Sequence, residues 1–271
     1  MRKMRWVLAM MMTMWPLAAC ARTVIQGTPV PATLQKPPSA APSDRPSQQP
    51  AWPKEAIQIL EPGPGSRLTS PLTMAGMADA TFEQTLIVRL VLDDGSLLVA
   101  QPITIASDAG QRGPFEARIP FNLSGERGAL LQVLENSARD GSIIHLASVG
   151  VTLAADGEAQ IQPAPPQSEQ LVILSPEPNA RVCGADVHVE GFGSASFEGT
   201  LVVEILDAEG QAVSMQPLIV QAHGMGSPGP FSIDLPCAVD HEQLGRIVVR
   251  DPLPAFDGLG HLNSIPVMLL P

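Results

Sequence analysis

Three kinds of side chain that could bind a metal recur along the chain at nearly constant spacing. The pairs are His145 and His261, Glu83 and Glu198, and Asp140 and Asp257, separated by 115 to 117 residues. Carboxylates could bind Ca²⁺, but that ion takes about six to eight oxygen ligands, and no Asp-x-Asp-x-Asp spacing is present. Neither recurring histidine has a second His or a Cys at the spacing of a zinc site. We therefore expect both histidines on a loop or edge-strand surface, and no bound metal.

The residues around the recurring glutamates have a plainer structural interpretation. Phe82 and Phe197 share the parity of the apolar residues in the strands that follow them, so we expect both in the core. Glu83 and Glu198 then point the other way. Each carboxylate is expected to accept backbone N–H groups of the loop before its strand.

Motifs for a catalytic nucleophile or a phosphate are missing from the sequence. The Gly-rich segment 191–196 lacks the Gly-x-Ser-x-Gly pattern and the strand–turn–helix setting of a nucleophile elbow. The segment 224–229 has no Lys and no following helix, so it is not a phosphate loop. These absences predict a protein that is not an enzyme and uses no cofactor.

The N-terminus has the three parts of a secretory signal. Arg2, Lys3 and Arg5 precede an apolar run, and small residues follow it. The 14 residues from Trp6 to Ala19 would span only about 21 Å as a helix, against a bilayer core of about 30 Å. The Leu-Ala-Ala-Cys ending resembles the lipobox of bacterial lipoproteins. That resemblance implies a signal peptide over 1–19, and an acylated Cys20 that anchors the protein at the extracytoplasmic face of a bacterial membrane. An ordinary signal peptide that happens to end beside a Cys is the alternative.

Composition restricts the partners and the organisation. Removing 1–19 takes away three of 16 basic residues and no acidic one, which leaves 13 − 27 = −14. Such a charge disfavours binding to nucleic acid. Residues 20–54 are rich in Pro and Ser, which predicts a disordered tether, and the composition of 156–169 predicts a second linker.

An internal repeat divides the rest of the chain into two copies of one domain, over 55–155 and 170–271. The matching segments are 82–88 with 197–203, 113–115 with 229–231, 59–62 with 173–176, and Gly76 with Gly191. The offset drifts only between 114 and 117, as expected when small insertions lie in loops.

Within each copy the alternation of apolar residues predicts β-strands. Leu86, Val88 and Leu90 alternate along one face, and Leu201 and Val203 repeat that alternation. In the first copy we expect strands near 57–61, 71–76, 85–93, 97–105, 115–121, 129–136 and 143–153. Turn signals every 8–12 residues, without helical periodicity, predict an all-β fold of two tandem antiparallel sandwiches.

Once Cys20 is assigned to lipid, two cysteines remain. Cys183 and Cys237 would lie in an oxidising compartment, where disulfides persist. In the first copy the equivalent residues are Leu68 and Phe121, so the two positions are expected to meet in both copies. We predict a disulfide, with two reduced buried thiols as the alternative.

Together these motifs resemble the immunoglobulin-like domain of bacterial spore-germination proteins. The resemblance rests on the Ile-x-Ile-x-x-Pro start, the Phe-Glu-x-Thr and Gly-Pro-Phe motifs and the late Asp-Gly, and covers 57–155 and 171–270. It implies an immunoglobulin-like sandwich that binds or spaces and is not known for catalysis. Because no separate germination domain is visible, a role in sporulation does not follow.

The leading hypothesis is a non-catalytic surface lipoprotein. Its two domains would bind a protein or cell-envelope partner or act as a spacer. The absence of Tyr, and the position of two of the three Trp in the signal, argue against a carbohydrate-binding module. The alternative is a metal- or small-ligand-binding receptor that uses the Phe-Glu and Asp-Gly loops. A hydrolase is the weakest reading.

Overall fold

The computed structural model describes residues 52–165, 168–224, 226–256 and 258–271. Cys20, the predicted signal peptide and most of the predicted tether lie outside the described residues. All described residues belong to one compact unit. Within them, no helix has the length and apolar character needed to cross a bilayer.

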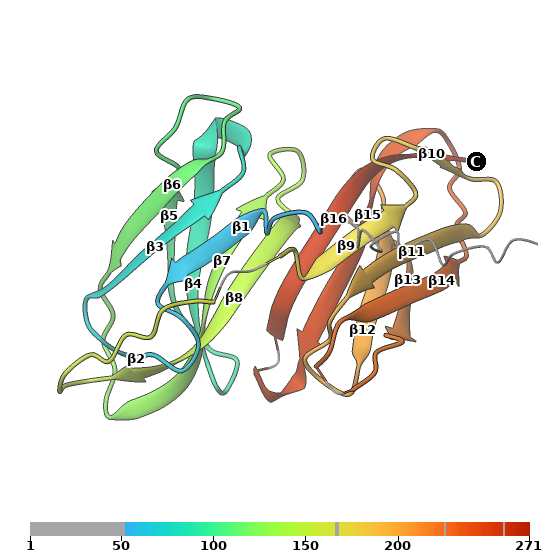
Figure 1. Cartoon of the computed structure of the whole chain (residues 1–271). Coiled ribbons are helices and arrows are strands. Elements are labelled where there is room, and N and C mark those ends of the chain that lie inside the picture. Colours follow the sequence, from blue (N-terminus) through green and yellow to red (C-terminus); the bar gives the residue numbers. More distant parts are fainter. Residues whose placement is uncertain (1–51, 166–167, 225, 257) are drawn as a thin grey trace, which may run out of the picture. The chain divides into compact units, whose positions relative to one another are not determined.

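The first domain is a sandwich of two antiparallel sheets (Figure 1). One sheet has the order β1-β3-β6 and the other β5-β4-β7-β8, with β2 added in parallel to β8. The strands are β1 (Ile57–Glu61), β2 (Arg67–Thr69), β3 (Leu72–Ala78), β4 (Thr85–Leu92), β5 (Leu97–Thr104), β6 (Gly113–Ile119), β7 (Glu126–Asn136) and β8 (Ile143–Ala154).

The second domain repeats this topology strand for strand. Its sheets have the orders β9-β11-β14 and β13-β12-β15-β16, with β10 parallel to β16. The strands are β9 (Leu171–Ser175), β10 (Arg181–Cys183), β11 (Val187–Gly193), β12 (Thr200–Leu206), β13 (Ala212–Ile219), β14 (Gly229–Leu235), β15 (Gln243–Leu253) and β16 (Gly258–Leu270). The predicted all-β fold of two tandem antiparallel sandwiches is confirmed. The short parallel strands β2 and β10 were not predicted, because three residues are too few to show alternation.

The core of each sandwich forms where alternation predicted it. Leu86, Val88 and Leu90 in β4 have no exposed surface, and Leu201 and Val203 in β12 repeat this. Burying each such side chain contributes about 1.5–3 kcal/mol.

A close contact explains two of the repeated motifs at once. Gly76 lies against the ring of Phe115, and a Cβ at this glycine would overlap both that ring and the carbonyl oxygen of Gln58. Gly191 and Phe231 make the same contact in the second domain. The repeated glycine and the repeated Gly-Pro-Phe motif are therefore the two sides of one packing contact.

The prediction that Phe82 and Phe197 lie in the core is wrong. Their exposed fractions are 65% and 47%. Phe82 belongs to a short 3-10 turn, η1 (Phe82–Gln84), in which Glu83 has a φ of 54° and Gln84 a φ of 52°. This left-handed backbone breaks the two-residue period between the phenylalanine and the strand that begins at Thr85.

The same turn gives the loop-anchoring role to Gln84 instead of Glu83. Gln84 is buried, and its amide nitrogen donates to Ser107 Oγ at 2.7 Å and to the carbonyl oxygens of Asp108 and Gln111 at 3.0 Å. Its amide oxygen accepts the Thr81 N–H at 3.2 Å. These contacts connect the turn before β4 to the loop between β5 and β6.

The predicted disulfide between Cys183 and Cys237 is present, with the two Cα atoms 5.5 Å apart. Both cysteines pack against the core of the second domain. Leu68 and Phe121, their equivalents, belong to the core of the first domain. The two copies therefore fill these positions with different chemistry, apolar packing in one and a covalent bond in the other.

The two domains meet along β8 and β16. These two strands lie side by side in Figure 1, and among the described residues Leu146 in β8 and Leu262 in β16 form the one bridging pair between the two larger sheets. Around it is a separate apolar cluster, the junction cluster, whose buried members are Leu134, Leu146, Val248 and Leu262. Leu146 and Leu262 are equivalent in the repeat, and they pair with one another in antiparallel strands. A local two-fold axis therefore relates the two sides of the junction.

Candidate functional site: a buried His–Glu cluster at the domain junction

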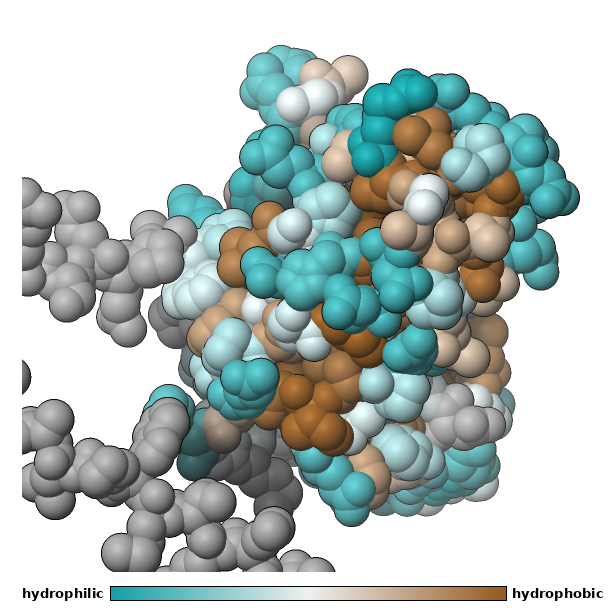
Figure 2. All heavy atoms as spheres, turned by 90° about the vertical axis from the view of Figure 1, so that its right-hand side faces the viewer, coloured by the Kyte–Doolittle hydropathy of each residue, from teal (hydrophilic) through white to brown (hydrophobic). Residues whose placement is uncertain are grey.

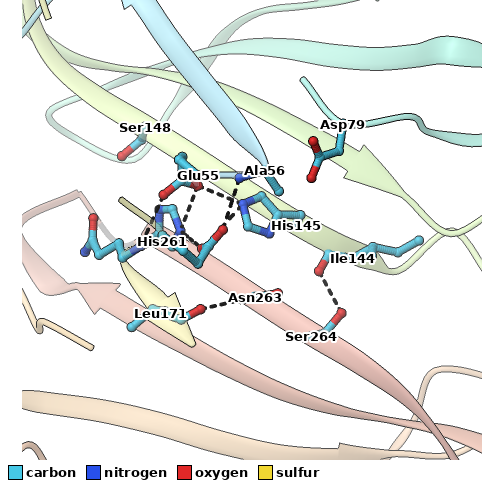
Figure 3. A network of polar contacts seen from close by, with 12 residues as sticks. Glu55, Ala56, Asp79, Ile144, His145, Ser148, Leu171, His261, Asn263 and Ser264 are labelled. Atoms are coloured by element: carbon cyan, nitrogen blue, oxygen red, sulfur yellow. Dashed lines mark hydrogen bonds and ion pairs between the residues drawn. The ribbon is translucent and has the colours of Figure 1, made fainter. Parts of the chain in front are cut away.

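Four potential metal ligands come together beside the junction cluster. They are Glu55, His145, Glu169 and His261, and one ligating atom from each lies within 4.8 Å of all the others (Figure 3). The histidines project from β8 and β16, and the glutamates stand just before β1 and β9. All four side chains are at least nine-tenths buried, with exposed fractions of 2 to 7%.

The cluster follows the local two-fold axis of the junction. Glu55 and Glu169 are 114 residues apart and the histidines 116, so each domain supplies one Glu and one His. Each carboxylate reaches across to the other domain: Glu169 Oε2 accepts the Ala56 N–H at 3.1 Å, and Glu55 Oε2 accepts the Gln170 N–H at 3.1 Å.

Two serine hydroxyls continue the symmetry along the paired strands. Ser148 donates to the carbonyl oxygen of Gly260 at 2.5 Å, and Ser264 donates to that of Ile144 at 2.6 Å. These two bonds are equivalent in the repeat. Figure 3 shows the Ser264 bond beside the cluster. Backbone and hydroxyl groups of both domains thus hold the cluster in place.

The second oxygen of each carboxylate faces both imidazoles. Glu55 Oε1 lies 2.9 Å from His145 Nε2 and 3.3 Å from His261 Nε2. Glu169 Oε1 lies 3.1 Å from His261 Nε2 and 3.8 Å from His145 Nε2. The two rings meet edge to face, with centroids 5.3 Å apart. Both Nε2 atoms and both Oε1 atoms therefore converge on one point.

Electrostatics favour a positive charge at that point. Burial alone would lower the pKa of the His145 imidazole, but the hydrogen bond to Glu55 and the charge of Glu169 outweigh burial and raise this pKa. Burial alone would raise the pKa of Glu169, yet its hydrogen bond to His261 and the charge of His145 leave this pKa below its usual value. Two buried carboxylates need compensating positive charge, which protons or a cation can supply.

A cleft of about 360 Å³ borders the cluster and is lined by Glu55, Glu169 and His261. On the same cleft Trp52 stacks on Phe192, with ring centroids 4.1 Å apart. The described end of the predicted tether, 52–54, therefore contacts the second domain, and Lys54 also forms a β-bridge with Ser168.

The expectation that His145 and His261 lie on a surface is wrong, although each belongs to the edge strand of its own domain's larger sheet. Both are buried, at 5% and 3% exposed, and lie in the paired strands of the junction. Each copy holds only half of the site, so no set of ligands is visible within one copy, and the structure combines the two halves. Glu55 and Glu169 were missed altogether. Both glutamates lie two residues before the first strand of their copy, and this recurrence at an offset of 114 could have identified them.

The other candidate residues that the structure describes do not join this cluster. Asp140 is held in its own loop, where its carboxylate accepts the N–H and hydroxyl of Ser142 at 2.9 and 2.7 Å. Glu83 is exposed. Asp257 lies outside the described residues, as does Cys20.

The strand order of the two domains makes this protein a tandem β-sandwich protein of the immunoglobulin-like class. Residues 56–142 and 170–253 match the family described as the immunoglobulin-like domain of bacterial spore germination. The matched segments make up more than half of the chain, so the chain belongs to this family and carries two copies of its domain. This confirms the resemblance proposed from the sequence motifs.

Other comparisons add little. No curated protein matches the chain. Among solved structures, it is similar to dimeric latent PorU from Porphyromonas gingivalis, at 10% identity and a TM-score of 0.25, over 80% of this chain and 24% of that one. Red sea bream transglutaminase matches at 8% and 0.28, over 80% and 31%. The titin domains z1z2 in complex with telethonin match at 13% and 0.20, over 80% and 96%. The chain thus spans less than a third of the first two, and no functional argument follows from these scores.

Proposed function

We propose that this protein is a non-catalytic lipoprotein, anchored through Cys20 at the extracytoplasmic face of a bacterial membrane. Its two immunoglobulin-like domains bind a protein or cell-envelope partner, or hold one at a distance from the membrane. The observation that carries the proposal is the pair of tandem domains of one immunoglobulin-like family, behind a Pro-rich segment and a Leu-Ala-Ala-Cys sequence that resembles a lipobox.

Exposed apolar side chains support a binding role for the second domain. Figure 2 shows one face of the protein, on which apolar patches lie between polar side chains. Large apolar residues that the second domain exposes among its described residues are Leu174, Phe197, Met215, Ile219 and Leu244, at 47 to 65%. A contiguous apolar surface rimmed by polar residues is typical of protein interaction sites, and of these residues Met215 and Ile219 share one face of the edge strand β13.

Contacts through side chains are favoured over strand addition at the edges of the larger sheets. The edge strands β5 and β13 contain Pro102 and Pro217 at equivalent positions. Proline has no N–H to donate, and it is a common device that protects sheet edges from pairing with other chains.

Membrane fractionation of cells that express the protein tests the anchor. Wild-type protein should sediment with membranes, whereas Cys20→Ala, or treatment with globomycin, should release it or leave it unprocessed. A matched control is the double variant Cys183→Ser/Cys237→Ser, which removes the other two cysteines and should leave membrane retention unchanged. A Cys20→Ala variant that is cut to the mature length of the wild type and is still fully retained on membranes would refute the lipid anchor.

A further inference from the structure

We propose that Glu55, His145, Glu169 and His261 bind one Zn²⁺ ion, which links the two domains at their junction. Structural zinc sites use four protein ligands, with His nitrogen and carboxylate oxygen among the accepted donors. Here two imidazole nitrogens and two carboxylate oxygens come from four separate segments, two per domain. The site is independent of the membrane anchor.

The spacing of the donor atoms fits a tetrahedral ion. Zinc–ligand distances of about 2.0–2.1 Å place neighbouring ligands of a tetrahedron about 3.3 Å apart. The four distances between carboxylate and imidazole atoms are 2.9, 3.1, 3.3 and 3.8 Å. The two remaining edges of the tetrahedron are no longer than 4.8 Å. Because all six edges of such a tetrahedron are about 3.3 Å, these two pairs of atoms would close by up to about 1.5 Å when the ion binds.

The ligands are also supported as metal ligands usually are. Second oxygens of both carboxylates accept backbone N–H groups at 3.1 Å, which fixes the orientation of the oxygens that face the centre. Asn263, two residues after His261, donates to the carbonyl oxygen of Leu171 at 2.6 Å. Such outer contacts orient the side chains that bind a metal and tune its properties.

Charge and donor type select the ion. Two carboxylates and two neutral imidazoles carry −2, so a divalent cation gives a neutral complex in a buried site, where uncompensated charge is costly. Calcium and magnesium prefer all-oxygen coordination with about six or more ligands, whereas imidazole nitrogens favour zinc and other late transition metals. The bordering cleft, which contacts Glu55, Glu169 and His261, gives the ion a path from solvent.

Zinc titration of the purified full-length protein, after treatment with a chelator, tests the proposal. Isothermal calorimetry should find one Zn²⁺ per chain, and zinc should raise the thermal unfolding midpoint. Co²⁺ in place of Zn²⁺ should give the intense visible absorption bands of tetrahedral coordination. Losing an outer contact of a metal site costs about 10- to 100-fold in affinity. The ligand variants Glu55→Gln and His261→Gln should lose at least as much.

His188→Gln is the matched control, because His188 is also an imidazole between carboxylates. Its ring nitrogens contact Asp234 at 2.6 Å and Glu190 at 3.1 Å, but on the exposed surface. This variant should keep zinc affinity and the Co²⁺ spectrum.

Three results would overturn the proposal: no zinc bound by the wild type, octahedral Co²⁺ bands, or loss of binding in His188→Gln alone. The first two need only the wild type, so a ligand variant that fails to fold leaves the test intact.

Discussion

The junction leucines make the sharpest test of how the two domains are held together. Leu146 and Leu262 are 1% and 5% exposed, and they pack in the junction cluster, apart from both sandwich cores. Truncating a buried Leu to Ala costs about 2–5 kcal/mol. These two side chains connect the domains at the junction and belong to neither core. Leu146→Ala should therefore weaken the coupling between the domains more than it lowers the stability of either one.

Trp52 provides the assay. It is the only tryptophan after residue 19, and it precedes the first domain while stacking on Phe192 of the second. Urea unfolding of the wild-type protein should give coincident transitions by tryptophan fluorescence and by far-UV circular dichroism. In Leu146→Ala/Leu262→Ala the fluorescence change should come at lower urea, because the junction opens while the sandwiches stay folded.

The two leucines face one another, so their effects should not add. Residues in contact show interaction energies of about 0.5–3 kcal/mol in double-mutant cycles, and the double variant should lose less than the sum of the singles. Leu244→Ala is the control, since this leucine is in the neighbouring strand β15 but is 49% exposed. Coincident transitions in the double variant, with midpoints like those of Leu244→Ala, would refute the role given to the junction.

Three further changes test the fold and its charges. Gly191→Ala places a Cβ against the ring of Phe231 and should cost about 1–3 kcal/mol by overpacking, read as a lower urea midpoint; an unchanged midpoint would contradict the close contact. Replacing Cys183 and Cys237 by Ser opens a link across 54 residues and should cost the second domain about 4 kcal/mol in the chain-entropy model, measured by calorimetry against the oxidised wild type. Burial alone would raise the pKa of the Asp140 carboxyl, but Ser142, Ser137 and Arg139 hold this pKa well below its usual value. Its stabilisation is therefore present above the unfolded pKa of about 3.9 and is lost as the pH falls through the folded pKa; Asp140→Asn should lower the urea midpoint at pH 7 and flatten its decline in acid, and an acid decline as steep as that of the wild type would contradict this.

Much of the fold could be predicted because local pattern and global fold agree in each copy. Alternation in 85–92 depends only on the two-residue period of a strand with one buried face, and all seven longer strands of the first domain form close to their predicted bounds. The internal repeat gave a second, independent reading of each strand. It also identified the two positions where Cys183 and Cys237 meet.

Phe82 shows where local reasoning ends. A two-residue period would point its side chain into the core only if Glu83 and Gln84 were extended, but both adopt left-handed backbone, which changes the direction of the side chain. The two-residue period does not predict such a break, because neither of the two residues is a glycine. The outcome is an exposed phenylalanine and a buried glutamine in place of the predicted core residue and loop carboxylate.

Two copies of one antiparallel sandwich can be predicted from the chain alone, because periodicity and repetition are properties of the chain that need no partner. What lies between the two copies depends on how the folded domains pack against each other. His145 and His261 each appeared alone within a copy, and Glu55 and Glu169 belonged to no motif. Pairing of Leu146 with Leu262 across a local two-fold axis brings all four side chains together. Which faces of two folded domains meet depends on surfaces that exist only after each has folded, so this site could not be read from spacing along the chain.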